Sequence, residues 1–409
     1  MKTNRIKKSI HKKVVDVKKS FPKITRITFV LLILTLLFLS LWYIPKLQIF
    51  LLGDSIQDPL ELAQLEDKFR STLAQILGGF VILVGLYLTH KRVLATEQSI
   101  IISQEGQITE RFTRAIEHLG KDQLEFKLGG IYALERIANE SEKDYWPIME
   151  ILCAYIRKNA PNAKNNHVIS PLTYKDYNGM RMDIEATLGV LTRRNIEHEK
   201  NKVPRIFNLS QTFLPKADFC EAYFPKLNLS QSNLVGVDFL LCNLKFANFS
   251  ATILSKADLS DAIFYGSNFH KAVLIDANLS RSNFSKSNFS QANLSQAILN
   301  LTDFSGANLS EANLSGATIE DVDFSKANLS KANFSGAIIS AVDFSGLNLS
   351  GANFSNAILD DVDFVDTNLS GVDFSGVDLS NIDISTANLS GAILGDKSKN
   401  VIKTFNEPC

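Results

Sequence analysis

The sequence predicts a chain of two unlike parts: two membrane-spanning α-helices with a helical connector, followed by an all-β coil. Three observations predict this. Two runs of 18 residues, 27–44 and 72–89, contain no charged residue. Apolar residues at helical spacing recur between 108 and 191, and from Leu209 to Leu394 every fifth residue is Leu, Phe or Ile.

Composition excludes several classes of protein. The 43 basic residues of the 409-residue chain balance 43 acidic ones. Residues 1–206 have nine more basic than acidic residues, whereas 207–395 have ten fewer. A uniformly basic nucleic-acid binder is excluded, and so is an acidic disordered chain, because 45% of residues are hydrophobic. The four cysteines have no CxxC spacing, which predicts neither disulfides nor a zinc site and fits a reducing compartment.

The run 27–44 is the first predicted transmembrane helix. Eighteen helical residues rise about 27 Å, which nearly matches a hydrocarbon core of roughly 30 Å. Trp42 and Tyr43 lie at its end, where aromatic residues favour the headgroup layer. A basic stretch precedes the run, so a cleavable signal peptide is the alternative. The run is long for a signal peptide, and no small-residue cleavage site follows it.

The run 72–89 is the second predicted transmembrane helix, with Arg70 before it and a basic triplet at 90–92 after it. Its three glycines would allow close approach of a neighbouring helix. The alternative is a buried core helix of a soluble domain. Because both runs have similar length and charged flanks, a transmembrane hairpin is the preferred interpretation.

Basic residues predict the orientation of this hairpin. Residues 1–26 contain ten Lys or Arg and one acid, whereas the connection 45–71 contains three basic and five acidic residues. By the positive-inside rule, both termini are cytoplasmic, 45–71 is extracytoplasmic, and the protein lies in the inner (cytoplasmic) membrane. The basic N-terminus would then contact anionic lipid of the bilayer.

Residues 90–206 are predicted to form a cytosolic helical connector. Gly106 is the expected interruption after the second membrane helix, and Gly120 the end of the next helix. Ser141 with Asp144 resembles a capping box. A polar loop is expected at 159–170. The helical spacing occurs at 108–119, 131–138, 146–156 and 184–191, which predicts a small bundle; the stretch 128–138 resembles a HEAT-type helix.

The repeat occupies 207–395. Its 38 central positions are 20 Leu, 15 Phe and three Ile. A small residue usually precedes each centre by two, Asn or Asp lies between, and Ser follows, as in the segment 307–310. Five matches neither the helical period of 3.6 nor the strand period of 2. The chain must therefore turn once per repeat.

These repeats resemble the A(D/N)LxX signature of pentapeptide-repeat proteins. That resemblance implies a right-handed quadrilateral β-helix, a solenoid with one pentapeptide per side and the central and small residues pointing inward. Steps of 20 residues give an independent indication of four sides, because Phe304 leads to Phe324, Phe344 and Phe364. Phe334, Leu309 and Ile319 begin three further columns of like residues. We expect opposite Phe columns to fill the axis and aliphatic columns to close the other walls.

Both ends of such a coil need cover, because open strand edges invite aggregation. The bundle through Arg194 is positioned to cover the first end. The tail 396–409 contains Val401, Ile402 and Phe405 and is predicted to cover the last turn. End-to-end dimerisation is the alternative, so a homo-oligomer is possible.

No catalytic, cofactor-binding or metal-ligating residues are predicted. The six histidines have no metal-ligand spacing, and the chain lacks GxxxxGK(S/T), GxGxxG and HExxH motifs. We therefore expect a protein that is not an enzyme and needs no cofactor.

An acidic face is the first candidate binding surface. The stretch 320–383 holds 11 acids and only two lysines. Pentapeptide-repeat proteins that protect topoisomerases have acidic faces resembling DNA, so the resemblance implies possible DNA mimicry. Alternatively, Asp simply replaces Asn at the turn position. The candidate residues are Glu320, Asp321, Asp323, Asp343, Asp360, Asp361, Asp363, Asp366 and Asp373.

An apolar strip is the second candidate surface. Ile298, Ile338 and Ile358 occupy the normally polar position before the centre, in steps of 20 residues or a multiple of 20, with Thr318 between. Such a strip can mark a partner surface. The alternative is that β-branched residues simply suit strands.

These features together predict a non-enzymatic, membrane-anchored scaffold whose cytosolic coil binds an unidentified protein partner. Direct nucleic-acid binding is not expected. One alternative is a DNA-mimic modulator of a topoisomerase or another DNA-binding protein. Another is a membrane sensor or effector that acts through the hairpin.

Overall fold

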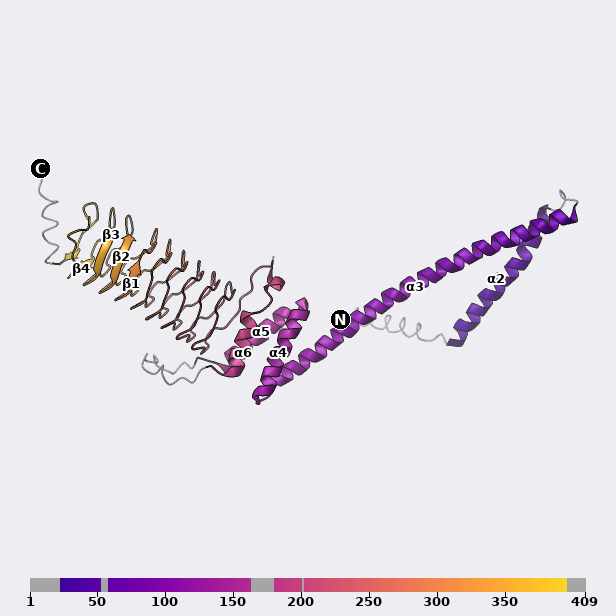
Figure 1. Cartoon of the computed structure of the whole chain (residues 1–409), viewed down its shortest axis with the longest axis horizontal. Helices are drawn as coiled ribbons and strands as arrows, with labels where there is room; N and C mark the ends of the chain where they lie inside the picture. Colours follow the sequence, from indigo (N-terminus) through magenta and orange to yellow (C-terminus); the bar gives the residue numbers. More distant parts are fainter. Residues whose placement is uncertain (1–22, 53–57, 163–179, 201, 396–409) are drawn as a thin grey trace, which may run out of the picture. The chain divides into compact units, whose positions relative to one another are not determined.

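The computed structural model describes residues 23–52, 58–162, 180–200 and 202–395, with only the backbone described at 23–31, 34 and 52. The chain divides into two compact units, 1–106 and 107–409. Figure 1 shows a helical N-terminal part and a repetitive C-terminal coil. The predictions for residues 1–22, for 163–170 and for the tail 396–409 lie outside the described residues.

The described helices and strands follow in chain order. The helices are α2 (Lys23–Leu52), α3 (Pro59–Leu119), α4 (Leu124–Glu140), α5 (Glu142–Asn159), α6 (Met182–Thr192) and the 3-10 helix η2 (Ile196–Glu199). The strands are β1 (Thr318–Glu320), β2 (Ile338–Asp343), β3 (Ile358–Asp363), β4 (Asp373–Phe374) and β5 (Ile393–Leu394).

Helices α2 and α3 extend well beyond the two uncharged runs. Most of the connection predicted at 45–71 is therefore helical and not a loop. Asp58 caps α3, because its Oδ1 accepts from the Leu60 backbone N–H at 2.9 Å, and Pro59 suits the first helical position. The predicted interruption at Gly106 is wrong, because α3 continues to Leu119. One interior glycine costs only about 1 kcal/mol relative to alanine, which a long helix tolerates.

Helix α3 is the one described helix that is long and apolar enough to cross a membrane. None of its most apolar window is buried, and the described part of α2 adds a shorter apolar stretch, Thr35–Leu51. The Trp42 ring of α2 lies 5.5 Å from the Arg70 guanidinium of α3 and 4.8 Å from the Lys46 ammonium. The membrane hairpin stays a prediction.

Helices α4, α5 and α6 pack into the predicted small bundle. Ser141 caps α5 by accepting from the Asp144 N–H at 3.3 Å, as expected from the capping-box pattern. In a full capping box the Ser141 N–H would donate to the Asp144 side chain. Here it donates to the Ile137 carbonyl at the end of α4 instead. Asp183 is buried in this bundle. Desolvation opposes its charge, but hydrogen bonds from Tyr155 and Arg181 outweigh it and lower the pKa of Asp183.

The coil confirms the inward assignment of the repeat centres. All 38 are buried except Leu359, Leu389 and Leu394, which are partly exposed. In the column from Phe304 to Phe364, successive rings stack with centroids 5.7, 5.6 and 5.4 Å apart. The opposite column, from Phe334 to Phe374, meets it edge to face. Opposite Phe columns therefore fill the axis of these turns, as predicted.

Earlier turns use the same aromatic packing on adjacent sides. The Phe249, Phe269 and Phe289 rings stack 4.7 and 4.5 Å apart. They meet the neighbouring column edge to face, as at Phe264 and Phe269. The Phe columns thus occupy adjacent sides here and opposite sides later in the coil.

Each corner of the coil has the same backbone chemistry. The second residue after each centre from Leu209 to Phe374 adopts positive φ, for example Asp321 at 53° and Gly336 at 65°. The outward Asn or Asp accepts from the backbone N–H two residues later, as Asn308 does from Ser310 at 3.1 Å. Backbone bonds then join successive turns, as from the Leu309 N–H to the Asn328 carbonyl at 2.8 Å.

The helical bundle covers the first end of the coil, as predicted. The Arg194 guanidinium lies between two rings, 4.3 Å from Phe207 and 4.1 Å from Phe224, and its side chain is 1% exposed. It forms an ion pair with Glu199 at 2.8 Å and donates to the Tyr223 carbonyl at 2.7 Å. Segment 160–162 joins the first turn through backbone hydrogen bonds to residues 211 and 213.

We predict that Phe344→Ala strongly lowers the melting temperature of the coil. Phe344 is fully buried between stacked rings, and removing a buried Phe side chain costs about 3–5 kcal/mol. Circular dichroism of the full chain in detergent measures this. Phe246→Ala is the matched control, because Phe246 is 54% exposed. Equal melting temperatures for the two variants would contradict the inward assignment.

We also predict that Arg194→Gln destabilises the junction of bundle and coil by about 3–5 kcal/mol, because it removes the buried cation and leaves the partly buried Glu199 without its ion-pair partner. The control is Arg193→Gln, whose ion pair with Glu135 is half exposed and worth under ~1 kcal/mol. Hydrogen exchange of residues 207–224 in the full chain measures the difference. Unchanged protection in the Arg194 variant would exclude a covering role.

Candidate functional site

The two candidate surfaces meet along one edge of the coil, on the three-stranded parallel sheet β1–β2–β3. Strand β3 illustrates the arrangement within six residues: Ile358, Asp360, Asp361 and Asp363 are exposed. Ile338 pairs in register with Ile358, and Asp343 with Asp363. The apolar strip therefore lies on one side of the coil and acids lie at the corner and on the next side. We call this region the candidate edge.

Regular strands form here because β-branched residues flank the corner. The outward column contains Thr318, Ile338 and Ile358, paired in order. On the inward side of the same corner, Val322 and Val342 replace the usual alanine and are buried. Such residues favour extended backbone, so the local sequence explains the strands. Strand formation, however, does not require the outward isoleucine side chains to be exposed to water.

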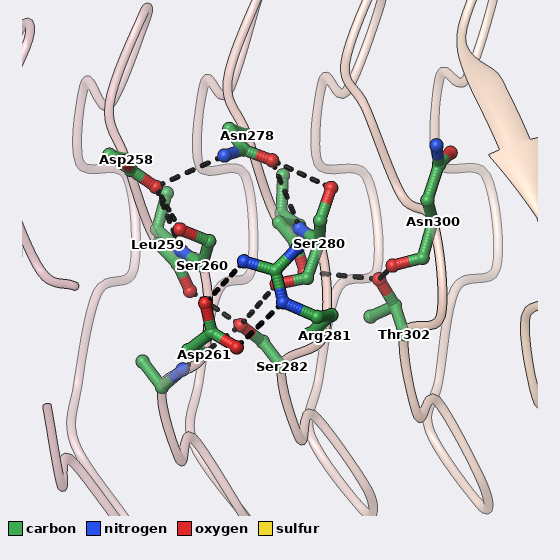
Figure 2. A network of polar contacts seen from close by, with 12 residues as sticks. Asp258, Leu259, Ser260, Asp261, Asn278, Ser280, Arg281, Ser282, Asn300 and Thr302 are labelled. Atoms are coloured by element: carbon green, nitrogen blue, oxygen red, sulfur yellow. Dashed lines mark hydrogen bonds and ion pairs between the residues drawn. The ribbon is translucent and has the colours of Figure 1, made fainter. Parts of the chain in front are cut away.

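The apolar strip, defined as Ile298, Ile338 and Ile358, is exposed along its length, with fractions of 43%, 49% and 61%. The preceding turns of the same column are polar. Figure 2 shows Asp258 accepting from the Asn278 side-chain amide at 3.2 Å, each also bonded to a serine of its own turn. The strip is thus a local feature of the later turns.

Charges at the corner also change along the coil. In the earlier turns Asp261 forms a bidentate pair with Arg281, which lowers the pKa of Asp261 chiefly through the side-chain hydrogen bond. Figure 2 shows this pair near Asp258 and Asn278. The later corner acids, defined as Glu320, Asp321, Asp360 and Asp361, have no ion-pair partner among the described residues.

A column of five aspartates runs beside the corner, at steps of 20 residues. This aspartate ladder comprises Asp303, Asp323, Asp343, Asp363 and Asp383. Each accepts from the backbone N–H two residues later, at 2.8 to 3.3 Å. The hydrogen bond from Ser385 lowers the pKa of Asp383. Within the described chain, none of the five forms an ion pair.

Turn chemistry alone does not explain this ladder, because asparagine provides the same hydrogen bond. The column from Asn208 to Asn388 accepts the same backbone bonds, and its amides also link successive turns, as from Asn328 to Asn308 at 3.3 Å. Ionised Asp cannot donate such a bond. Two unit charges about 4.8 Å apart in water repel by roughly 0.9 kcal/mol. The ladder is therefore unfavourable for folding relative to Asn.

The structure gathers most, but not all, of the predicted acidic residues at this edge. Asp366 lies beyond the ladder, at the next corner. Asp373 does not belong to the edge, because it lies in β4, half a turn from the ladder, and pairs with Ile393 of β5. Sequence reasoning missed Asp303 and Asp383 as ladder members. A 20-residue step in either direction from the central aspartates would have found them.

The described residues offer little other chemistry. No group of three His, Cys, Asp or Glu among them could hold a metal ion. Burial raises the pKa of Cys153 and of Cys242 to about 12, so neither thiol is activated. A cavity of about 310 Å³ beside α5 is lined by residues of both charges, among them Glu142, Lys202 and Arg205.

Comparison with family models identifies the repeat. A model described as "Pentapeptide repeat region" matches residues 317–394. A model described as "Pentapeptide repeats (8 copies)" matches 208–239, 242–281 and 272–310. The chain is a pentapeptide-repeat protein. No curated protein matches it.

Several solved structures are similar to this pentapeptide-repeat protein. HetL, involved in heterocyst differentiation regulation in the cyanobacterium Nostoc sp. strain PCC 7120, is 27% identical, with 49% of this chain and 91% of HetL covered and a TM-score of 0.26. Trypsin-treated QnrB1, a plasmid-mediated fluoroquinolone resistance protein, is 20% identical over 46% of this chain and 99% of QnrB1, with a TM-score of 0.29. A pentapeptide-repeat protein of the Arabidopsis thaliana thylakoid lumen is 30% identical over 22% of this chain and 61% of that protein, with a TM-score of 0.21.

We predict that replacing Asp323, Asp343 and Asp363 together by Asn raises the melting temperature by a few degrees at low salt. The change removes like-charge repulsion and keeps the turn hydrogen bonds, and 1 kcal/mol corresponds to roughly 2–4 °C at this size. Thermal melts at 20 mM and 1 M NaCl measure this. The gain should shrink at high salt, where the Debye length is about 3 Å.

The reverse change is the matched control: Asn328→Asp with Asn348→Asp should lower the melting temperature. If the Asp-to-Asn variant melted lower than the wild type, the ladder would be a structural requirement and not a sign of binding.

Proposed function

We propose that this pentapeptide-repeat protein is a non-enzymatic, membrane-anchored scaffold whose cytosolic coil binds a protein partner at the candidate edge. One observation carries the proposal: exposed isoleucines and acids without ion-pair partners among the described residues lie together on one sheet. Exposed apolar residues bordered by charge are typical of protein-binding surfaces. Direct nucleic-acid binding is disfavoured, because both partners would be negatively charged.

The membrane anchor is supported by the exposure of α2 and α3. Phe38 and Phe50 of α2 are 70% and 81% exposed, and Phe80 and Leu83 of α3 are 63% and 65% exposed. Side chains of this kind need an apolar environment. The distribution of basic residues supports an inner-membrane location with both termini in the cytoplasm.

DNA mimicry is the second candidate, favoured by the regular spacing of charges in the aspartate ladder. It predicts that the purified full chain inhibits DNA supercoiling by a topoisomerase. Nine of the 13 acids in residues 301–395 lie at the candidate edge, beside an apolar strip, which fits a peptide-like partner better than a surface that binds the DNA backbone.

We predict that the full chain stays in the membrane pellet after alkaline carbonate extraction. A fluorescent protein fused after Cys409 should fluoresce, whereas alkaline phosphatase fused there should be inactive, because the C-terminus is expected in the cytoplasm. Deletion of residues 27–89 should release the protein from the membrane pellet into the supernatant. Release of the intact chain by carbonate would exclude the anchor.

We also predict that Ile338→Gln with Ile358→Gln removes a specific set of neighbours from proximity labelling. A biotin ligase fused to the C-terminus of the full chain provides the labelling, and Ile393→Gln is the control because Ile393 is 55% exposed away from the edge, in β5. Identical labelling by the wild-type chain, the double variant and the Ile393 control would argue against a partner at this edge.

A further inference from the structure

The spacing of the candidate edge restricts the shape of its partner. Apolar and acidic side chains repeat along the coil once per turn, because Ile338 pairs with Ile358 and Asp343 with Asp363 in register. Parallel strands lie about 4.8 Å apart. A partner that lies along the coil must present its own side chains at nearly this interval.

An α-helix meets this requirement and an extended strand does not. Apolar residues alternately three and four apart on a helix repeat every ~5.25 Å along its axis. Residues on one face of a strand repeat every ~6.7 Å. From Ile298 to Ile358 the edge makes three steps of 20 residues. Over three steps a helix drifts by about 1.4 Å relative to the coil, whereas a strand drifts by about 6 Å.

We propose that the candidate edge binds an amphipathic α-helix of a partner protein, lying along the coil axis, with apolar residues on the strip and Lys or Arg residues along one flank. This rests on the proposed function, since it requires a protein partner. The charges support it, because the basic flank would meet the corner acids and, by the reach of long side chains, the aspartate ladder. An acidic or neutral helix would leave these acids unpaired.

The opposite border of the strip leaves room for the helix backbone. Gly336 occupies the corner before Ile338, and a Cβ built there meets nothing within 4 Å. The equivalent corners before the other two isoleucines of the strip carry the uncharged residues Gln296 and Asn356. This side is therefore open at Gly336 and uncharged along the strip, while the other side carries charge. The asymmetry predicts that the partner helix is basic on one flank only.

A designed peptide pair tests this shape. The probe is a 21-residue peptide with Leu at heptad positions a and d, Lys along one flank and one photo-reactive leucine. Its isomer has the same composition with Lys and Leu alternating. Full-length protein in phosphatidylcholine nanodiscs is titrated with each peptide, and empty nanodiscs provide the blank. We expect at least tenfold tighter binding of the helical peptide and cross-links at 338–363.

Matched variants separate specific docking from general charge attraction. Asp323→Asn, Asp343→Asn and Asp363→Asn together should weaken binding at least tenfold, and so should Ile338→Gln with Ile358→Gln. Asp218→Asn, Asp238→Asn and Asp258→Asn remove equal charge from earlier turns of the strip's own column and should change binding less than twofold. Equal losses in the two aspartate triples would overturn the proposal.

The cross-links distinguish failure of the helical-partner proposal from failure of the proposed protein-binding function. If the alternating isomer binds more tightly and cross-links to 338–363, the helical partner is wrong and a protein partner at the edge stands. If neither peptide cross-links there, the edge is not a docking surface for such segments, and the proposed function loses its main support as well.

Discussion

The hydrogen bonds between successive turns are the interaction on which the rest of this structure depends. Each turn donates to the next at fixed register, as from the Phe304 N–H to the Asp323 carbonyl at 2.8 Å. This register places residue n beside residue n + 20 on every side. Identical rings can then stack along the axis, and buried Leu and Phe side chains each contribute on the order of 2 kcal/mol. The backbone hydrogen bonds thus place residues that are 20 apart in the sequence in columns along the coil.

The same register gives outward residues an unusual property: their spacing along the coil is set by the backbone and not by their own packing. A charged column is therefore held at strand spacing even though its members repel one another. On a flexible loop such charges would move apart. Held in register, the acids and isoleucines of the candidate edge form a rigid pattern, which lowers the ordering cost of binding.

Much of the coil could be predicted from the sequence, because every turn repeats the same five-residue pattern. A wrong assignment at one repeat therefore does not shift the assignment of the others. The columns of Phe304 and Phe334 followed from counting in twenties. The candidate edge was only partly predictable. Counting acids over a stretch of sequence grouped Asp373 with the ladder, although the coil turns it to another side. The Asn and Asp columns can be found by counting in twenties, but the amide hydrogen bonds that link successive Asn residues are seen only in the structure.

The helices were less predictable than the coil. Apolar runs located their centres, but the bounds depend on caps such as Asp58 with Pro59, and a single glycine at 106 did not break α3. The position of Arg194 at the first turn was predicted only as the end of a covering bundle. Its place between Phe207 and Phe224 depends on contacts between segments distant in sequence.

The two ends of the coil differ in a way that bears on self-association. The first end is covered by the bundle, whereas among the described residues Leu389 and Leu394 of the last turns are partly exposed, and the tail 396–409 lies outside the described residues. Residues 301–395 contain 13 acids against two lysines, so two such ends would repel each other. Asp383 contributes to this effect, and the hydrogen bonds from Ser385 lower its pKa. Charge near an open strand edge opposes edge-to-edge pairing. The acids therefore disfavour end-to-end dimers while leaving the side of the coil available to a basic partner.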